Sequence, residues 1–415
     1  MAPRKKRNGS SGTRTRLKLF NTISMRKERF ESLTPAQVKM FVCGPTILDY
    51  IHVGHVRTYV FYDVLARYLR YLGFDVRFIL NITDIDDSIV KGAKMRRRTV
   101  ESFLELNEKT FLRDVKALGI STISSFERVS RYLPVMIQQA AGLIRNGHAY
   151  RADGGVYFDV EKFPDFGKLS RQSRDKLALR PLEISPKKRN QVDFSLWRPT
   201  TSTEQRWESP WGLGTPGWHI QDTAVSVANF GPQYDIHGGA RELIYPHHEA
   251  EIAQVEALTG LKPFVRYWVH TGLLTIDGRK MSKSEGNVYY AHDLLRRHDV
   301  NSVRLYFAGL HHRKDAEFDE DSIERIGEKY WEWKGRVESV QRRMPREDAT
   351  TDGGKLTPFL RALDDDIDGP RAVKLLGSMV GEAARERDPR LLARLYAAIA
   401  SASQILGIGL VKDAN

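Results

Sequence analysis

Cysteine is nearly absent from this chain of 415 residues, which has a single one, Cys43. One thiol excludes a disulfide framework and favours a reducing compartment, so we expect a cytoplasmic protein. No apolar run approaches the roughly eighteen residues of a membrane-spanning helix, and no apolar stretch near the start resembles a secretory signal. The sequence therefore predicts a protein without a membrane partner.

Acidic residues are missing from the first twenty positions, which contain seven Lys or Arg, and the whole chain has a net charge of +13. Basic surfaces gain affinity for polyanions by releasing counterions, so this charge suggests a nucleic-acid partner without establishing one. We predict that residues 1–16 form a disordered basic arm. A targeting signal or a solubilising charge explains the arm equally well.

The hydrophobic pattern after the arm is typical of an α/β protein. VKMFVCGPT (38–46) and DVRFILNIT (75–83) have the composition of buried strands. Between them, Val56, Val60 and Val64 recur at helical spacing. Strand, helix and strand within about fifty residues form a βαβ unit, which implies a parallel sheet. A largely helical stretch is expected from about residue 99 to 147.

At 47.5 kDa the chain is long enough for two or three domains. Between about residues 150 and 215 the sequence is basic and has no regular hydrophobic pattern. The α/β pattern then resumes, and beyond about residue 315 the pattern is helical throughout. We predict a parallel sheet split by an insertion and followed by a helical bundle. The predicted parts are 1–16 (arm), 17–115 (first half of the sheet domain), 116–215 (insertion), 216–315 (second half) and 316–415 (bundle).

The tetrapeptide His52-Val53-Gly54-His55 lies between the first strand and its helix. A helix N-terminus offers free N–H groups and a positive dipole end to phosphate, and Gly54 allows close approach. Two imidazoles there can stabilise charge in nucleotidyl transfer. Taken alone the motif is weak, because paired loop histidines often form only local hydrogen bonds.

A second motif, KMSKS at residues 280–284, follows a Gly-Arg turn. Its lysines and serines offer cations and hydroxyls to a pyrophosphate leaving group, although a solvated lysine loop is the better explanation of the pentapeptide alone. The pair of motifs is far more specific, and it resembles the class I aminoacyl-tRNA synthetases, which have a Rossmann-type fold. That resemblance assigns catalysis to His52, His55, Lys280 and Lys283, and ATP binding to these together with Gly54, Ser282 and Ser284.

Six stretches in order, from FVCGPTILDYIHVGH through NITDIDDSI, SPWGLGTPGWHI, YDIHGG and YPHHEAEIAQ to KMSKSEGN, are similar to cysteinyl-tRNA synthetases. The similarity runs from about residue 17 to 315 and continues more weakly into the helices. It implies that L-cysteine and MgATP form cysteinyl-AMP, and that tRNA(Cys) then accepts the cysteinyl group. We expect a monomer, and a short form that lacks the family's C-terminal anticodon-reading module.

Taken by itself, Cys43 is better explained as a small buried residue than as a ligand or nucleophile. The family resemblance instead makes it a ligand of one Zn²⁺ per chain, together with His247 and Glu251, with the zinc binding the thiolate of the substrate. The i, i+4 spacing of His247 and Glu251 places both on one helix face. The family's remaining cysteine ligand is replaced by Asp222, which either coordinates the metal or leaves a site that has lost zinc.

The resemblance also assigns eight residues to the pocket that binds the adenylate, and each of them is also explained by a purely structural role. They are Gly44, Thr46, Thr58, Asn81, Thr83, Trp218, His237 and Gly238. The segment Ala240–Glu242 departs from the family pattern, so its contacts stay open. For Asp84, Asp86 and Asp87 we favour loop hydrogen bonding over a second metal cluster.

Two other functions remain open. A cysteine-activating ligase that joins cysteine to a small amine, like the mycothiol cysteine ligase, is favoured by the length of the chain and opposed by its basic charge. A paralogue that binds RNA without charging it is opposed by the intact HVGH and KMSKS motifs.

Overall fold

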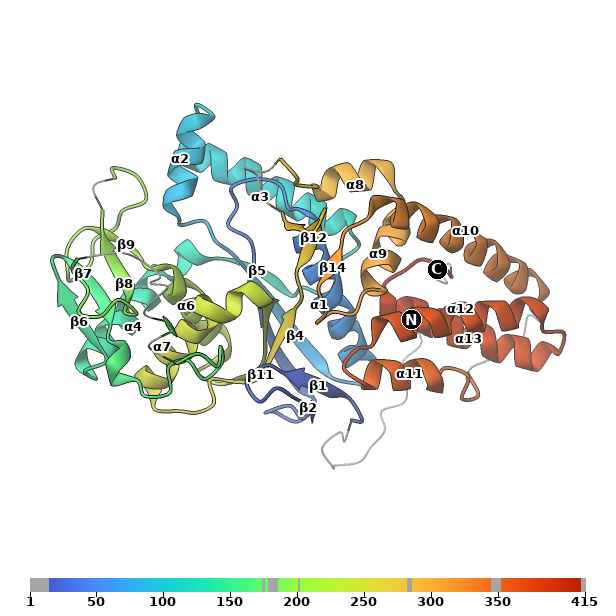
Figure 1. The fold of residues 1–415 in the computed structure, drawn as a ribbon. Helices are drawn as coiled ribbons and strands as arrows, with labels where there is room; N and C mark the ends of the chain where they lie inside the picture. The colour runs from blue at the N-terminus through green and yellow to red at the C-terminus, as the bar shows by residue number, and fades with distance from the viewer. Residues whose placement is uncertain are drawn as a thin grey trace.

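The computed structural model describes residues 15–173, 176–177, 186–200, 202–281, 286–344 and 352–411. The basic arm therefore lies outside the described residues, apart from its last two positions. The chain forms a central sheet, a smaller sheet at one end and a helical bundle at the other (Figure 1). No helix of the described residues combines the length and the apolar character needed to cross a membrane.

The central sheet is parallel, as predicted, and its five strands lie in the order β11-β10-β3-β4-β5. Their bounds are β3 Gln37–Val42, β4 Asp75–Ile82, β5 Ser125–Arg128, β10 Tyr234–Ala240 and β11 Val265–Thr271. The first half of the chain supplies β3, β4 and β5, and the second half supplies β10 and β11. The strand order reverses between β3 and β10, and the carboxyl ends of strands at such a point form a crevice for ligands.

Helix α1 (Val53–Tyr71) connects β3 to β4 and ends two residues before Gly73. The predicted stripe is buried, but so are Arg57 and Asp63, which lie outside it. A helix that is buried on most of its surface has neighbours on both sides. Here α1 packs against the sheet on one side and against α9 (Val300–Ala308) and α13 (Pro389–Leu406) on the other.

The stretch expected to be largely helical contains α3 (Val100–Ala117) and α4 (Leu133–Arg145), with β5 between them. Strand β5 pairs in parallel with β4. It therefore belongs to the central sheet, although it lies within the range predicted for the insertion. The antiparallel sheet of the insertion begins later, with β6 (Ala149–Ala152), β7 (Gly155–Phe158), β8 (Phe194–Pro199) and β9 (Gly214–Pro216) in that order. The exact domain boundaries stay a prediction.

The second half of the sheet domain carries α6 (Trp218–Phe230) and α7 (Glu249–Thr259), which pack against α4 and the insertion sheet in one hydrophobic cluster. A short segment with a kink, η4 (Ile244–His248), leads into α7, and the backbone of Tyr245 within it is extended (φ −131°, ψ 129°). The strands β12 (Leu274–Ile276), β13 (Arg279–Lys280) and β14 (Ala316–Glu317) form a separate small sheet beside the helices. The residues 282–285 between β13 and α8 (Ala291–Arg297) lie outside the described residues.

The C-terminal part is helical, as predicted, and consists of α10 (Glu320–Arg343), α11 (Thr357–Asp364), α12 (Gly369–Arg385) and α13. Its apolar faces join the core of the sheet domain in one cluster. Arg304 on α9 links the two parts, because its guanidinium donates to the carbonyl of Leu406 on α13 at 3.0 Å and lies 2.6 Å from the buried Asp63 carboxylate on α1. The remaining elements are the hairpin β1 (Lys18–Asn21) and β2 (Arg26–Arg29), helix α2 (Asp87–Met95), and the 3₁₀ turns η1 (Val129–Tyr132), η2 (Val160–Lys162) and η3 (Arg241–Leu243).

Candidate active site and metal centre

The carboxyl ends of β3 and β10 bring the FVCGPT and YDIHGG stretches together. Cys43 follows β3 directly, and its N–H donates to the carbonyl of Gly238 at 3.0 Å. Any side chain at Gly238 would overlap the ring of Tyr62, with a Cβ only 2.3 Å from it. A Cβ on Gly44 would lie 1.7 Å from the carbonyl oxygen of Asn81. These two glycines therefore allow the close strand and loop packing that positions Cys43.

The four predicted metal ligands meet at this point. One ligand atom from each of Cys43, Asp222, His247 and Glu251 lies within 4.8 Å of every other, and all four residues are buried. His247 belongs to the segment η4 rather than to α7, yet the spacing still brings its Nε2 to 2.9 Å from Glu251 Oε1. His247 Nε2 lies 3.2 Å from Asp222 Oδ2.

The charge on this cluster is unusual for a buried site. Burial alone would lower the pKa of His247, but the carboxylates of Glu251 and Asp222 raise it to about 10. Burial also raises the pKa of the Cys43 thiol. Neither carboxylate oxygen of Glu251 accepts a hydrogen bond of good geometry from the described residues. A buried sulfur, an imidazole and two carboxylates, one of which accepts no hydrogen bond of good geometry from the described residues, fit a divalent cation such as Zn²⁺.

The side chain of Asn81 binds both Asp222 and the loop that carries Cys43. Asn81 Nδ2 donates to Asp222 Oδ1 at 2.9 Å, and Asn81 Oδ1 accepts from the N–H of Gly44 at 2.6 Å. One amide thus positions both the aspartate and the loop that carries Cys43. Thr83 lies behind Asn81, whose amide is 3.3 Å from the threonine hydroxyl.

Three histidines that sequence reasoning did not single out surround the cluster. The Nε2 of His248 lies 3.1 Å from the sulfur of Cys43, and its Nδ1 lies 2.8 Å from Nε2 of His270. The Nδ1 of His219 lies 3.0 Å from that of His247. Burial lowers the pKa of His219, His248 and His270, so these imidazoles are neutral at pH 7. The adjacent histidines of PHHEAE are a local sequence signal for His248, whereas His219 and His270 come from other segments of the chain.

His237 is a further histidine beside Cys43. Its Nε2 lies 3.4 Å from Cys43 Sγ, and Tyr234 OH lies 2.6 Å from its Nδ1. Cys43, His237, His248 and Glu251 form a second group with metal-ligand spacing, which shares two members with the predicted one. His237 and Gly238 are buried and lie outside the lining of the adjoining cavity.

The HVGH motif lies at the N-terminus of α1, as predicted. His52 is the N-cap residue, and its Nδ1 accepts a hydrogen bond from the N–H of Gly54 at 3.1 Å. The N–H of His52 in turn donates to Nδ1 of His55 at 3.3 Å, and the two ring centroids are 4.0 Å apart. The motif therefore both caps the helix and places two imidazoles at its positive end.

The HVGH motif and Cys43 line one cavity of about 400 Å³. Other predicted residues that line it are Gly44, Thr46, Thr58 and Trp218, whereas Asn81 and Thr83 lie outside its lining. Trp218 is 43% exposed and stacks on His247 at 4.4 Å, so it is not a core residue. Ala240 and Glu242, whose contacts stayed open, also contribute. The side chain of Lys280, and Ser282, Lys283 and Ser284 entirely, lie outside the described residues.

Arg57, one turn into α1, connects the HVGH helix to the segments on the other side of the cavity. Its Nη1 donates to the carbonyl of Leu273 at 2.6 Å, and its Nη2 to those of His311, at 3.1 Å, and Lys314. Leu273 lines the cavity and immediately precedes β12. Burial lowers the pKa of Arg57 to about 10, which leaves it charged at pH 7.

Replacing Arg57 by methionine is expected to lower the free energy of unfolding by about 3 kcal/mol, because several part-buried carbonyls lose a charged donor. Thermal melting of the full chain measures the effect. Arg26→Met is the matched control, since this arginine on β2 is exposed and its side chain forms no ion pair or hydrogen bond with the described residues, so that its loss is expected to cost less than about 0.5 kcal/mol. Equal melting temperatures for the two variants would contradict this role.

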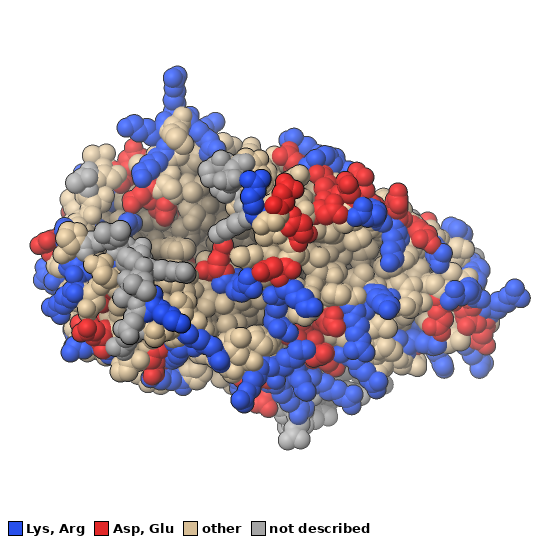
Figure 2. Space-filling model, viewed as in Figure 1, with Lys and Arg blue, Asp and Glu red and all other residues tan. Residues whose placement is uncertain are grey.

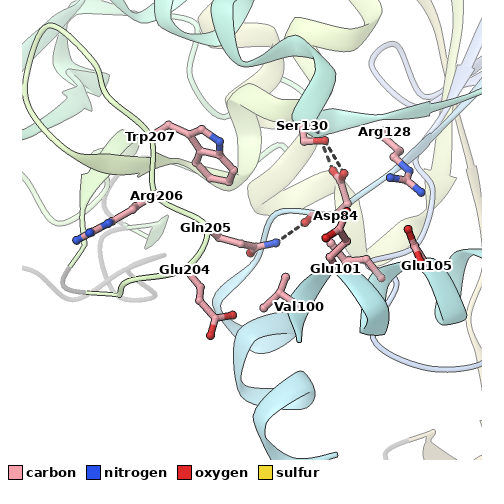
Figure 3. A pocket seen from close by; sticks show the side chains of 11 residues that line it. Asp84, Val100, Glu101, Glu105, Arg128, Ser130, Glu204, Gln205, Arg206 and Trp207 are labelled. Carbon is pink, nitrogen blue, oxygen red and sulfur yellow. Dashed lines mark hydrogen bonds between the residues drawn. The ribbon is translucent and has the colours of Figure 1, made fainter. Parts of the chain in front are cut away.

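The acidic loop after β4 makes hydrogen bonds, as we favoured. Asp84 accepts from the N–H and hydroxyl of Ser130 at 2.9 and 2.5 Å, and the amide of Gln205 donates to its carbonyl at 2.6 Å (Figure 3). Asp86 caps α2, and Asp87 pairs with Arg198. Asp84 lines a second cavity, of about 390 Å³, between α3 and the loop that carries Trp207. Within the described residues, these aspartates do not come together as metal ligands.

Comparison with known proteins identifies the family of the chain. A family described as tRNA synthetases class I (C) catalytic domain matches residues 29–328, which include every predicted site residue. The chain belongs to this family.

Its relatives in the family include a cysteine--tRNA ligase of Moorella thermoacetica, 39% identical over 384 residues, which are 88% of this chain and 80% of that protein. A cysteine--tRNA ligase of Thermococcus kodakarensis is 43% identical over 310 residues, 74% of this chain and 65% of that one. Methionyl-tRNA synthetase of Mycobacterium tuberculosis in complex with methionyl-adenylate has the same fold, with a TM-score of 0.63 over 89% of both chains at 18% identity. The predicted Rossmann-type class I synthetase fold is thereby confirmed.

Proposed function

We propose that this protein is a cysteine--tRNA ligase, which activates L-cysteine with ATP and transfers it to the 3′ end of tRNA(Cys). The observation that carries the proposal is the shared cavity. Cys43, a member of the buried ligand group, and both histidines of the helix N-terminus line the same space. A site that recognises a thiol thus adjoins a site that recognises phosphate.

In the first step the carboxylate oxygen of cysteine attacks the α-phosphorus of MgATP. A P–O bond forms, the bond to the β-phosphate oxygen breaks, and pyrophosphate leaves with the electron pair. His52 and His55 are positioned at the positive end of α1 to stabilise the negative charge that develops. We assign Lys280 and Lys283, with Ser282 and Ser284, to the leaving pyrophosphate.

We propose that Cys43, Asp222, His247 and Glu251 hold one Zn²⁺ ion. Bound there, zinc would supply a Lewis acid that prefers the thiolate of cysteine to the hydroxyl of serine. Asn81 orients Asp222 by donating to its Oδ1, and the neutral imidazole of His248 contacts Cys43. Trp218 stacks on His247 and also lines the cavity.

In the second step the terminal ribose hydroxyl of tRNA attacks the carbonyl carbon of cysteinyl-AMP and releases AMP. The activity belongs with translation in the cytoplasm, and we keep the monomer as part of the proposal. The net charge of +13 favours a polyanionic acceptor over a small amine.

The deciding experiment incubates the full chain with labelled cysteine, MgATP and either total tRNA or a panel of small amines. We expect labelled tRNA, and no cysteinyl amine. Formation of cysteinyl-AMP with transfer only to an amine would replace the ligase assignment by the small-amine alternative. Binding of tRNA without formation of cysteinyl-AMP would instead support the non-enzymatic paralogue.

A further inference from the structure

Helix α2 and the turn after it form a basic projection on the surface. Figure 1 shows α2 rising from the body of the molecule, and Figure 2 shows Lys and Arg side chains gathered at the same place. The segment from Lys91 to Arg98 contains five cations and no acid, and all five are exposed. Met95 at its end is 82% exposed. Five positive charges are thus concentrated in eight consecutive residues on the surface.

Two of the five cations fix the projection to the protein. Arg96 donates to the carbonyl of Leu48 at 3.0 Å and lies 3.7 Å from Asp49, and Arg98 donates to the hydroxyl of Ser102. The side chains of the other three, Lys91, Lys94 and Arg97, form no ion pair or hydrogen bond with the part of the chain that the structure describes. We call these three residues the α2 tip.

The α2 tip has a fixed position beside the active site. Leu48 packs against the small apolar cluster of Ile89, Ala93 and Phe103 that joins α2 to α3. The segment that contains Leu48 runs from Thr46, in the lining of the cavity, to His52 at the start of α1. A macromolecule bound to the α2 tip would therefore lie near the cavity that holds the reacting groups.

We propose that the α2 tip binds backbone phosphates of the tRNA next to its 3′ end. This inference rests on the proposed function and names the surface through which that function reaches its acceptor. Lys91 and Lys94 are three residues apart and so project from the same helix face, with Arg97 following in the turn. Cations that have no carboxylate partner lose little when they exchange water and counterions for phosphate.

The test replaces the α2 tip by glutamines, as Lys91→Gln, Lys94→Gln and Arg97→Gln in one protein. Glutamine keeps much of each side chain and removes its charge. The matched control replaces Arg145, Arg151 and Lys162 of the insertion by glutamine, three cations that are also exposed and have no partner among the described residues. Both variants lose three positive charges, so a general effect of net charge is common to both.

The measurement is kcat/KM for tRNA in aminoacylation, as a function of salt concentration, with cysteine-dependent pyrophosphate exchange as the readout of folding and activation. For the α2 tip variant we expect the log–log salt slope to fall in magnitude by about 2–3, at 0.7–0.9 per phosphate contact. The control should keep the wild-type slope, and both should keep wild-type exchange.

The outcomes separate the two proposals. Equal salt slopes for the α2 tip variant and the wild type would overturn the assignment of this surface while leaving the ligase intact. An equal loss of slope in the control would also overturn it, because the effect would then be one of net charge. A wild-type chain that forms cysteinyl-AMP and never charges tRNA would contradict the proposed function itself.

Discussion

Replacing Cys43 by serine is expected to remove the metal from the protein and to abolish cysteine-dependent pyrophosphate exchange. The thiolate is the strongest zinc ligand of the group, and a hydroxyl in its place is a far weaker one. Mutation of a residue that only hydrogen-bonds to a metal ligand typically weakens metal affinity about 10–100-fold. Removal of a ligand itself should weaken zinc affinity by more than this. Elemental analysis should find about one zinc per chain in the wild type and almost none in the variant.

Asp222 permits a sharper version of the same experiment. Asp222→Asn keeps the shape of the side chain but removes its charge, and we expect it to bind zinc more weakly than the wild type. Asp222→Cys adds a second thiolate to Cys43, His247 and Glu251 and should bind zinc more tightly. Full occupancy in Cys43→Ser and also in His247→Ala would show that the metal is bound elsewhere, and Cys43 would then be a small buried residue.

Loss of the His52 imidazole is expected to slow pyrophosphate exchange about 10²–10³-fold, as for removal of one transition-state donor. His52 also caps α1, so a simple alanine variant would confuse catalysis with helix stability. His52→Asn separates the two roles, because an asparagine oxygen can still accept from the N–H groups of the first turn.

Exchange kinetics and melting temperature are therefore measured together for His52→Asn and His52→Ala. Both variants should lose the same factor in rate, whereas only the alanine variant should lose stability, by about 1 kcal/mol. A His52→Asn protein that exchanges at the wild-type rate would reduce the histidine to a helix cap and remove it from the proposed mechanism.

Local patterns in the sequence predicted the elements that carry the site. The stripe of Val56, Val60 and Val64 predicted α1, and the strand that ends before Cys43 was placed correctly to within a few residues. The i, i+4 spacing of His247 and Glu251 predicted their contact. Such features depend on residues close in the chain, so helical and strand periodicity is sufficient to recognise them.

Strand β5 was not predicted, because it depends on a pairing between residues far apart in the chain. It has four residues, all half-buried, and its sequence Ser125–Arg128 contains one aromatic residue and two charged ones. Its pairing with β4 decides that it is a strand, and the paired residues are 46 positions apart in the chain. Propensity in a window of a few residues contains no information about such a partner.

The sequence by itself determined the family motifs, the candidate ligands Cys43, Asp222, His247 and Glu251, and the helix N-terminus that offers its imidazoles to phosphate. Only the tertiary structure decided that Asn81 joins Asp222 to Gly44, and that His248 and His270 stand behind Cys43. These contacts join segments of the chain that are as many as 205 residues apart. The packing of β3 against β10 brings them together, and no local periodicity specifies that arrangement.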